Sequence, residues 1–260
     1  GFSGLIRQSF TLNPRHKVAY IVSSSWRPAA PNELYANGVH QGIAAIEIGD
    51  PGMKRERSYN LSIEHIIETK QLYVGYELIA KYIDGYINLV PGKAPILTIR
   101  GAFPSFYYTQ QNALIYGGIF NLRYSIDSHW TLKMRGNILN GDNLSSKTYL
   151  NQMMPYDGRM EMQYERGQFQ VKVFGDYISK QWRYVDSSDY IAPPASYFLL
   201  GLEVQHHIKV KQFEMKWALS ISNLLNTSYR DYLNRFRYYT DAQGRNIQFR
   251  LNIPFNHSKK

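Results

Sequence analysis

The sequence predicts an all-β protein, an antiparallel transmembrane β-barrel, and three observations support this fold class. Segments that alternate apolar and polar residues recur along the whole chain, the connections between them are alternately short and long, and aromatic residues gather at the segment ends. Period-2 alternation places successive side chains on opposite faces of a strand. Most of the segments are close to the length, about nine to eleven residues, with which a tilted strand crosses a bilayer.

The composition excludes several other classes of protein. With 44% hydrophobic and 15% aromatic residues the chain of 260 residues is too apolar for disorder, and it has no apolar run long enough for a transmembrane helix. The lack of cysteine removes disulfides and thiolate chemistry. A net charge of +10 without long Lys/Arg runs does not favour nucleic acid as a partner. Hydrolase, P-loop and dinucleotide-binding motifs are missing, so no enzyme and no catalytic residue is expected.

About eleven strands are expected, which we take in chain order. They cover residues 5–12, 17–25, 56–67, 72–86, 116–125, 130–138, 159–164, 169–177, 198–205, 213–222 and 246–255. The last two carry the clearest signal: Trp217, Leu219 and Ile221 share one face, as do Phe249 and Leu251, and polar or small residues stand between them. The earlier strands repeat this pattern, and none reads at the helical period.

The connections strictly alternate in length. Short turns at 13–16, 69–71, 127–129, 166–167 and 209–211 separate long polar loops at 26–55, 87–111, 141–157, 181–195 and 223–244. This asymmetry is typical of a transmembrane barrel, with tight periplasmic turns and long extracellular loops, and is not expected of a soluble sandwich.

Aromatic residues indicate which solvent surrounds the apolar faces. Tyr124 and Trp130 flank a short turn, whereas Tyr177, Trp182 and Tyr197 lie where strands meet long loops. Two such girdles favour a lipid boundary, although aromatic residues are also common in any strand. An odd number of strands does not close a single-chain antiparallel barrel, so either a strand is missed or the chain is part of a larger barrel.

Two stretches of the sequence resemble a known family. The first stretch contains Arg27-Pro28, Asn32-Glu33-Leu34-Tyr35, Gly38, His40, Gly42, Glu47, Gly49, Pro51, Lys54, Glu56 and Ser58. The second contains Asn223-Leu224-Leu225-Asn226, Tyr229, Tyr232, Gly244-Arg245 and the final Phe255. Together they bracket nearly the whole chain, which resembles the C-terminal half of the β-barrel of a TonB-dependent outer-membrane receptor.

This resemblance implies the architecture and the setting of the protein. The family's barrel has about 22 strands, so the chain would supply half of it, and residues 1–260 would form one domain without the N-terminal plug. The bacterial outer membrane would be its location, with membrane lipid and lipopolysaccharide around it. Its partners would be the TonB complex, acting through the absent plug, and the barrel-assembly machinery, which would recognise Phe255. The function implied is TonB-powered uptake of a scarce nutrient, a ferric siderophore or another metal complex.

Candidate binding residues lie in the loops and on the predicted lumen face. The loop candidates for a metal-chelate ligand are Glu33, Tyr35, His40, Glu47, Tyr107 and Tyr184. Basic lumen candidates, which would favour anionic cargo, are Arg123, Lys133, Arg135, Arg159, Lys172, Lys216 and Arg250. The alternative for the basic set is pairing with Glu64, Glu77, Glu161, Asp176, Glu203, Glu214 or the plug.

Three further interpretations stay open from the sequence. His40 is a weak candidate for metal or haem contact, and an ordinary loop histidine is the default; no cofactor is expected. Loop aromatics such as Tyr190, Tyr232 and Tyr238 either stack on a ligand or join the loops to each other. The cluster Arg230, Arg235, Arg237 and Arg245 either meets lipopolysaccharide phosphates or is solvated. For the whole chain, the rival functions are a passive porin-like channel and a soluble all-β binding module.

Overall fold

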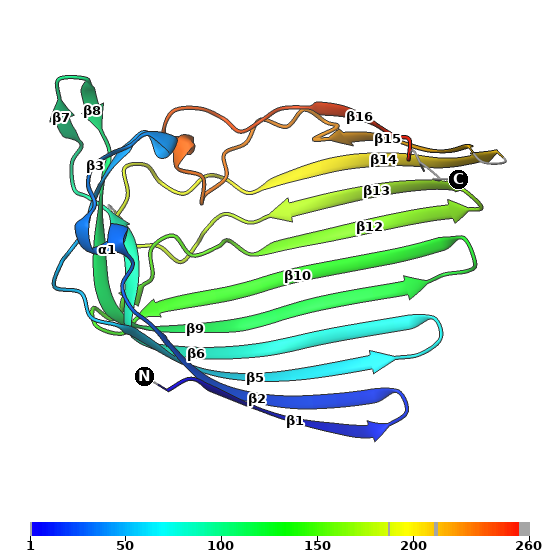
Figure 1. Cartoon of the computed structure of the whole chain (residues 1–260), viewed down its shortest axis with the longest axis horizontal. Helices are drawn as coiled ribbons and strands as arrows, with labels where there is room; N and C mark the ends of the chain where they lie inside the picture. Colours follow the sequence, from blue (N-terminus) through cyan, green and yellow to red (C-terminus); the bar gives the residue numbers. More distant parts are fainter. Residues whose placement is uncertain (1, 187, 211–212, 255–260) are drawn as a thin grey trace, which may run out of the picture.

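One large curved sheet makes up most of the computed structural model, which describes residues 2–186, 188–210 and 213–254. The sheet has 14 strands (Figure 1). Its main path runs through β1 (Gly4–Asn13), β2 (His16–Arg27), β5 (Glu56–Glu68), β6 (Leu72–Pro91), β9 (Ser105–Ser125), β10 (Trp130–Asn143), β12 (Asp157–Arg166), β13 (Phe169–Ile178), β14 (Tyr197–Val210), β15 (Phe213–Ser222) and β16 (Asn246–Asn252). Each strand of this path pairs antiparallel with the next, and β1 and β16 are its two edges. All of the predicted strands are therefore confirmed, in the predicted order, and the sheet is an open, partial barrel.

Cross-strand register gives this wall of strands one apolar and one polar face. Leu219 lies opposite Val204 on one side and Phe249 on the other, and the same row of pairings continues across the sheet. Large side chains of this apolar face stay exposed, including Val22 at 54% and Phe249 at 64%. The neighbouring residue Ser220 lies opposite Glu203 and therefore belongs to the polar face. An apolar face that no protein layer covers fits a surface that meets lipid.

The wall has two different ends (Figure 1). At the turn end, tight turns join the strands, and side chains close them: the Asp127 carboxylate accepts hydrogen bonds from the backbone N–H of His129 at 2.7 Å and of Trp130 at 2.8 Å. At the loop end lie the long connections. The small buried cluster of Ile83, Ala113 and Leu150 also lies there, so little of the molecule is a conventional core.

The predicted loop 87–111 holds more structure than expected. β6 and β9 continue well beyond the predicted strand ends at residues 86 and 116, and they pair as far as Pro91 and Phe106. The extra length passes a bulge between Ile83 and Tyr86, where Gly85 has φ +67°, a conformation that favours glycine. The alternation in these extensions is too irregular to predict, because the paired strands there face other loops and not a uniform solvent.

The remaining elements are short and lie at the loop end. They are α1 (Pro31–Tyr35), β3 (Asn37–His40), η1 (Gln41–Ile43), β4 (Ala45–Ile48), β7 (Ile96–Thr98), β8 (Gly101–Phe103), β11 (Thr148–Tyr149) and η2 (Arg235–Tyr238). β4 adds to β9 in parallel, with Ile46 opposite Ser105, so the first long loop folds back onto the tall β6–β9 hairpin. No helix in the described ranges is long and apolar enough to span a membrane.

Candidate functional site

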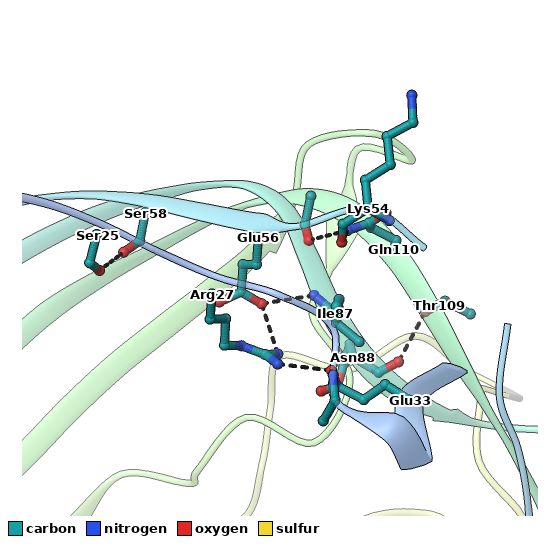
Figure 2. A network of polar contacts seen from close by, with 12 residues as sticks. Ser25, Arg27, Glu33, Lys54, Glu56, Ser58, Ile87, Asn88, Thr109 and Gln110 are labelled. Carbon is teal, nitrogen blue, oxygen red and sulfur yellow. Dashed lines mark hydrogen bonds and ion pairs between the residues drawn. The ribbon is translucent and has the colours of Figure 1, made fainter. Parts of the chain in front are cut away.

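The loops of the loop end are joined by three polar clusters into one assembly, which we call the loop cap. The first cluster is centred on Arg27, the last residue of β2 (Figure 2). Its guanidinium donates to Glu33 at 2.8 Å and to Glu56 at 3.1 Å. Each carboxylate also accepts a backbone N–H, Glu33 from Ala30 at 2.7 Å and Glu56 from Ile87 at 3.1 Å. α1 and the β6–β9 hairpin are thereby fixed to the end of β2.

Gln110 anchors the return of the first loop beside this cluster (Figure 2). Its side-chain oxygen accepts from the Lys54 N–H at 2.9 Å, and its amide nitrogen donates to the carbonyls of Lys54 at 2.8 Å and Gly85 at 2.9 Å. A Cβ on Gly85 would lie 2.9 Å from that amide nitrogen. The bulge therefore favours glycine through its backbone conformation, and a Cβ there would also displace the Gln110 amide from its hydrogen bonds.

The second cluster surrounds Glu47 of β4. Arg235 of η2 donates to its carboxylate at 2.9 Å, Tyr108 donates at 3.1 Å, and His40 Nδ1 lies 3.4 Å away. Asn32 of α1 donates in turn to the Tyr108 hydroxyl at 2.8 Å. Burial alone would raise the pKa of the Glu47 carboxyl, but the hydrogen bonds from Arg235, His40 and Tyr108 hold it below the ordinary value.

Both predicted acidic loop residues, Glu33 and Glu47, form ion pairs within these two clusters. Glu33 is held by Arg27 and Glu47 by Arg235, so both carboxylates are already compensated by a guanidinium. Burial likewise opposes ionisation of Glu33, but the hydrogen bonds from Arg27 and from the Ala30 N–H lower its pKa. Within the described residues no group of three or more His, Asp or Glu side chains gathers to hold a metal ion. The two predicted acidic residues are therefore engaged in ion pairs within the protein.

The third cluster is the most buried and centres on Asp189. Its carboxylate pairs with Arg237, which is only 2% exposed, and accepts the Tyr238 hydroxyl at 2.5 Å. The Arg237 guanidinium also lies 5.0 Å from the ring centre of Tyr232 and 4.8 Å from that of Tyr238. Burial and the nearby Asp189 carboxylate raise the pKa of the Tyr238 hydroxyl.

The loop aromatics divide into two groups. Tyr190, Tyr232 and Tyr238 join loops to one another; the Tyr190 hydroxyl, for example, accepts the Ser105 N–H at 2.8 Å. Tyr35 at 70%, Tyr107 at 39% and the side chain of His40 at 58% are exposed and available for contact with a ligand. Tyr184 is half-buried, and its hydrogen bond to Asp186 raises the pKa of its hydroxyl. The exposed candidates are therefore aromatic and imidazole groups, whereas the acidic candidates are compensated by guanidinium groups.

On the polar face, some of the predicted basic residues are paired and others are not. Lys133 pairs with Glu161 at 3.1 Å, Arg159 with Asp176 at 3.2 Å, and Lys172 with Glu203 at 2.7 Å. The acids Glu64 and Glu214 are instead used by Arg7 at 2.5 Å and His207 at 2.6 Å. In the described part of the chain no carboxylate lies within ion-pair distance of the remaining basic candidates, Arg123, Arg135, Lys216 and Arg250. Arg123 and Arg135 line a hollow of about 510 Å³ on this wall.

Most arginines of the cluster near the last loop are paired with carboxylates of the protein itself. Arg235 and Arg237 pair with Glu47 and Asp189, and Arg230 pairs with Asp241 at 2.6 Å. Arg245 donates to the backbone carbonyl of Leu224 at 2.8 Å. Three of these four groups therefore hold the loop cap and do not offer free charge to phosphates. The predicted assembly signal, Phe255, lies outside the described residues.

Sequence reasoning named Arg235 and Arg237 but not their partners, and it missed Tyr108 and Asp189 as residues that build the cap. The contacts between the loops are made by Arg235, Tyr108, Asp189 and Arg237. None of these residues lies in a sequence motif that predicts which residue it contacts. Arg235 and its partner Glu47 are separated by 188 residues. The cluster of arginines in the last loop was the one sequence feature that indicated these contacts. In the structure, Arg235 and Arg237 of this cluster pair with carboxylates of other loops.

Comparisons with known proteins agree with this geometry. The chain matches the family model described as TonB dependent receptor-like, beta-barrel, over residues 8–226. A search of curated proteins gave no match. Among solved structures it is similar to the copper transporter OprC, with TM-score 0.80, 17% identity, and coverage of 97% of this chain and 39% of that one.

Two siderophore receptors show the same partial overlap. A variant of the ferric enterobactin receptor PfeA from Pseudomonas aeruginosa aligns with TM-score 0.70 and 13% identity, over 96% of this chain and 39% of that one. The siderophore receptor PirA from Acinetobacter baumannii aligns with TM-score 0.64 and 16% identity, over 96% and 40%. The chain thus spans about two fifths of the length of these proteins. The predicted fold class, partial barrel and outer-membrane location are confirmed.

Proposed function

Because the chain belongs to the TonB-dependent receptor β-barrel family, whose members are outer-membrane transporters rather than enzymes, we propose that it forms part of the wall and the loop cap of a receptor that imports a metal complex. The cargo proposed is a ferric siderophore or a related metal chelate. Energy for its release into the periplasm would come from the TonB complex, acting through a plug domain of the full-length receptor.

One observation carries this proposal: the long loops are fixed to one another over one end of the wall. A porin-like pore needs an open entrance, whereas a receptor needs a preorganised surface that captures its ligand before transport. Here four separate loops meet through Arg27, Glu47 and Asp189. Tyr35, His40 and Tyr107 of the same loops are exposed and offer aromatic and imidazole surfaces.

The chemistry of this surface suits a bulky chelate better than a bare ion. A chelate presents aromatic or amide groups that stack on Tyr rings and carries acidic oxygens that accept hydrogen bonds. The unpaired lumen residues Arg123 and Arg135 would then attract a net-negative complex along the channel. Neither role requires a resident metal or cofactor of the protein.

Uptake by the full-length receptor tests the proposal. The receptor would be expressed in a host that lacks its own iron receptors, and cells would receive catecholate and hydroxamate siderophores loaded with radioactive iron. We expect uptake of at least one complex, abolished by a protonophore, and near-silent conductance in a planar bilayer. Uptake that survives the protonophore, or a steadily open conductance, would establish the passive channel instead.

A variant pair localises the capture surface. Tyr35→Ala removes an exposed ring of the loop cap, whereas Tyr59→Ala removes a partly exposed ring, 44%, from the membrane face of β5. Loss of one stacked aromatic side chain would weaken ligand binding roughly fivefold, since such contacts contribute about 1 kcal/mol. Binding of the same labelled complex to de-energised cells measures this step, and equal affinity in both variants would remove Tyr35 from the site.

A further inference from the structure

Two histidines from different hairpins face each other at the turn end, far from the loop cap. His16 is the first residue of β2, and His65 lies on β5, diagonally opposite it. Their ring nitrogens, His16 Nδ1 and His65 Nε2, are 3.1 Å apart. Both side chains are half-buried and lie on the apolar face, in register with Tyr76 of β6. This places them where the membrane face meets the periplasmic water.

Tyr76 fixes the orientation of the central ring. Its hydroxyl lies 2.8 Å from His65 Nδ1 and its ring packs edge-on against the imidazole, with centroids 5.2 Å apart. When His65 Nδ1–H donates to this oxygen, the lone pair of Nε2 points at His16. A metal-bound histidine commonly has this arrangement, in which a partner on the second nitrogen selects the tautomer and holds the ring.

The separation of the two nitrogens matches a metal site. Metal–nitrogen bonds of about 2.0–2.1 Å place two neighbouring imidazole nitrogens roughly 2.9–3.4 Å apart, for angles between square and tetrahedral. The observed 3.1 Å, which here is a hydrogen bond between the two imidazoles, lies within this range, so an ion would take the place of the shared proton. We propose that His16 and His65 form a binding site for a divalent transition-metal ion, completed by water, with Tyr76 as a positioning residue. Cu²⁺ should bind most tightly of the first-row divalent ions.

Such an ion would link the first two hairpins of the described sheet. β2 belongs to the hairpin β1–β2 and β5 to the hairpin β5–β6, so a single ion would touch both hairpins. An ion bound between β2 and β5 would raise the free energy of unfolding, and the increase would grow with the logarithm of the ion concentration divided by its dissociation constant. The site shares no residue with the loop cap and does not depend on the proposed cargo.

Copper binding to the full-length receptor in detergent micelles tests the site. Cu²⁺ alone is titrated by calorimetry, and the bound ion is examined by electron paramagnetic resonance. The wild type should bind one more Cu²⁺ than either His16→Gln or His65→Gln, with a spectrum that shows two nitrogen ligands for that ion. Tyr76→Phe should weaken binding at this site by about tenfold or more, because the ring loses its partner.

A matched control separates this pair from ordinary surface histidines. His129 lies in a neighbouring turn, with Nδ1 2.9 Å from the Ser128 hydroxyl and its ring stacked on Tyr164. His129→Gln should leave the copper stoichiometry and the spectrum unchanged. Heat-modified mobility on gels confirms that each variant is folded. If folded His16→Gln and His65→Gln bind as many Cu²⁺ ions as the wild type, the proposal is overturned, as it is if Tyr76→Phe binds with unchanged affinity.

Discussion

The wall and the loop cap use charged residues in opposite ways. On the polar face of the wall, Lys133 and Glu161 pair directly across two strands, and the lysine side chain stays 42% exposed. In the cap, Arg237 is buried and pairs with Asp189. An exposed pair contributes little to stability, whereas a buried pair cannot lose one partner without a large penalty. Removal of one charge should therefore be tolerated in the wall and disruptive in the cap.

The two regions also differ in the sequence separation of the residues that hold them together. Adjacent strands of the wall follow each other in sequence, so period-2 alternation and a tight turn specify most of it. The cap is held by contacts such as Arg237 with Asp189 and Arg235 with Glu47, across 48 and 188 residues. The cap can form only after the wall has brought its loops to one end.

The largest effect is expected from Arg237→Met. This change leaves the Asp189 carboxylate buried without its cation, and the loss should be about 3–5 kcal/mol in the opening free energy of the cap. Hydrogen exchange of residues 223–244, compared with β12 and β13, measures it. The double variant Arg237→Met/Asp189→Leu should recover much of the protection, because an apolar pair replaces the ion pair. Protection unchanged in the single variant would show that the pair does not hold the cap.

A slightly smaller effect should come from the membrane face of the wall. Leu219→Arg places a cation on the apolar face in the middle of β15 and should cost roughly 2–4 kcal/mol of unfolding free energy in a bilayer. Ser220→Arg, one residue further and on the polar face beside Glu203, should be nearly neutral. Unfolding by guanidinium in lipid vesicles measures both. Equal losses at the two positions would contradict the assignment of the faces.

Much of the wall could be predicted from sequence because each strand meets two uniform environments. Lipid on one side and water on the other impose strict alternation, as in Trp217, Leu219 and Ile221, so strand number, order and facing followed from the pattern. The ends of β6 and β9 were wrong because their extensions leave the bilayer and contact other loops. No periodic environment acts on those residues, so no period marks them.

The cap was predicted only as a set of candidates. Glu33, Glu47 and His40 stand in the recognised loop motif, but sequence alone did not reveal that Arg27 and Arg235 neutralise the two acids. The charge of a buried side chain predicts that it has an oppositely charged partner. It does not predict which residue of the sequence that partner is. The predicted roles of these residues in ligand binding remain predictions.

A smaller effect should appear when the charge of Glu47 is titrated, since the protonated carboxyl keeps part of its hydrogen bonding. Its folded pKa lies below the ordinary value of 4.5, so its ionised form stabilises the cap above that pH and the contribution is lost as the pH falls toward the folded pKa. The difference in proteolysis rate between wild type and Glu47→Gln should stay constant from about pH 7 to about pH 5 and shrink below about pH 4.5. A difference that grows on acidification would contradict the sign.

The smallest effect belongs to the exposed pair on the wall. Lys133→Met removes the contact with Glu161 but leaves that carboxylate on a wetted face, so the cost should be about 0–1 kcal/mol. A double-mutant cycle with Glu161→Gln, measured by the same unfolding assay as Leu219→Arg, isolates the pair. A coupling energy as large as that of Arg237 with Asp189 would mean that the lumen face is shielded from water in the full-length receptor. The ion pairs of the wall would then be as strongly coupled as those of the cap. The difference in exposure between the two regions would hold only for the open sheet and not for the full-length receptor.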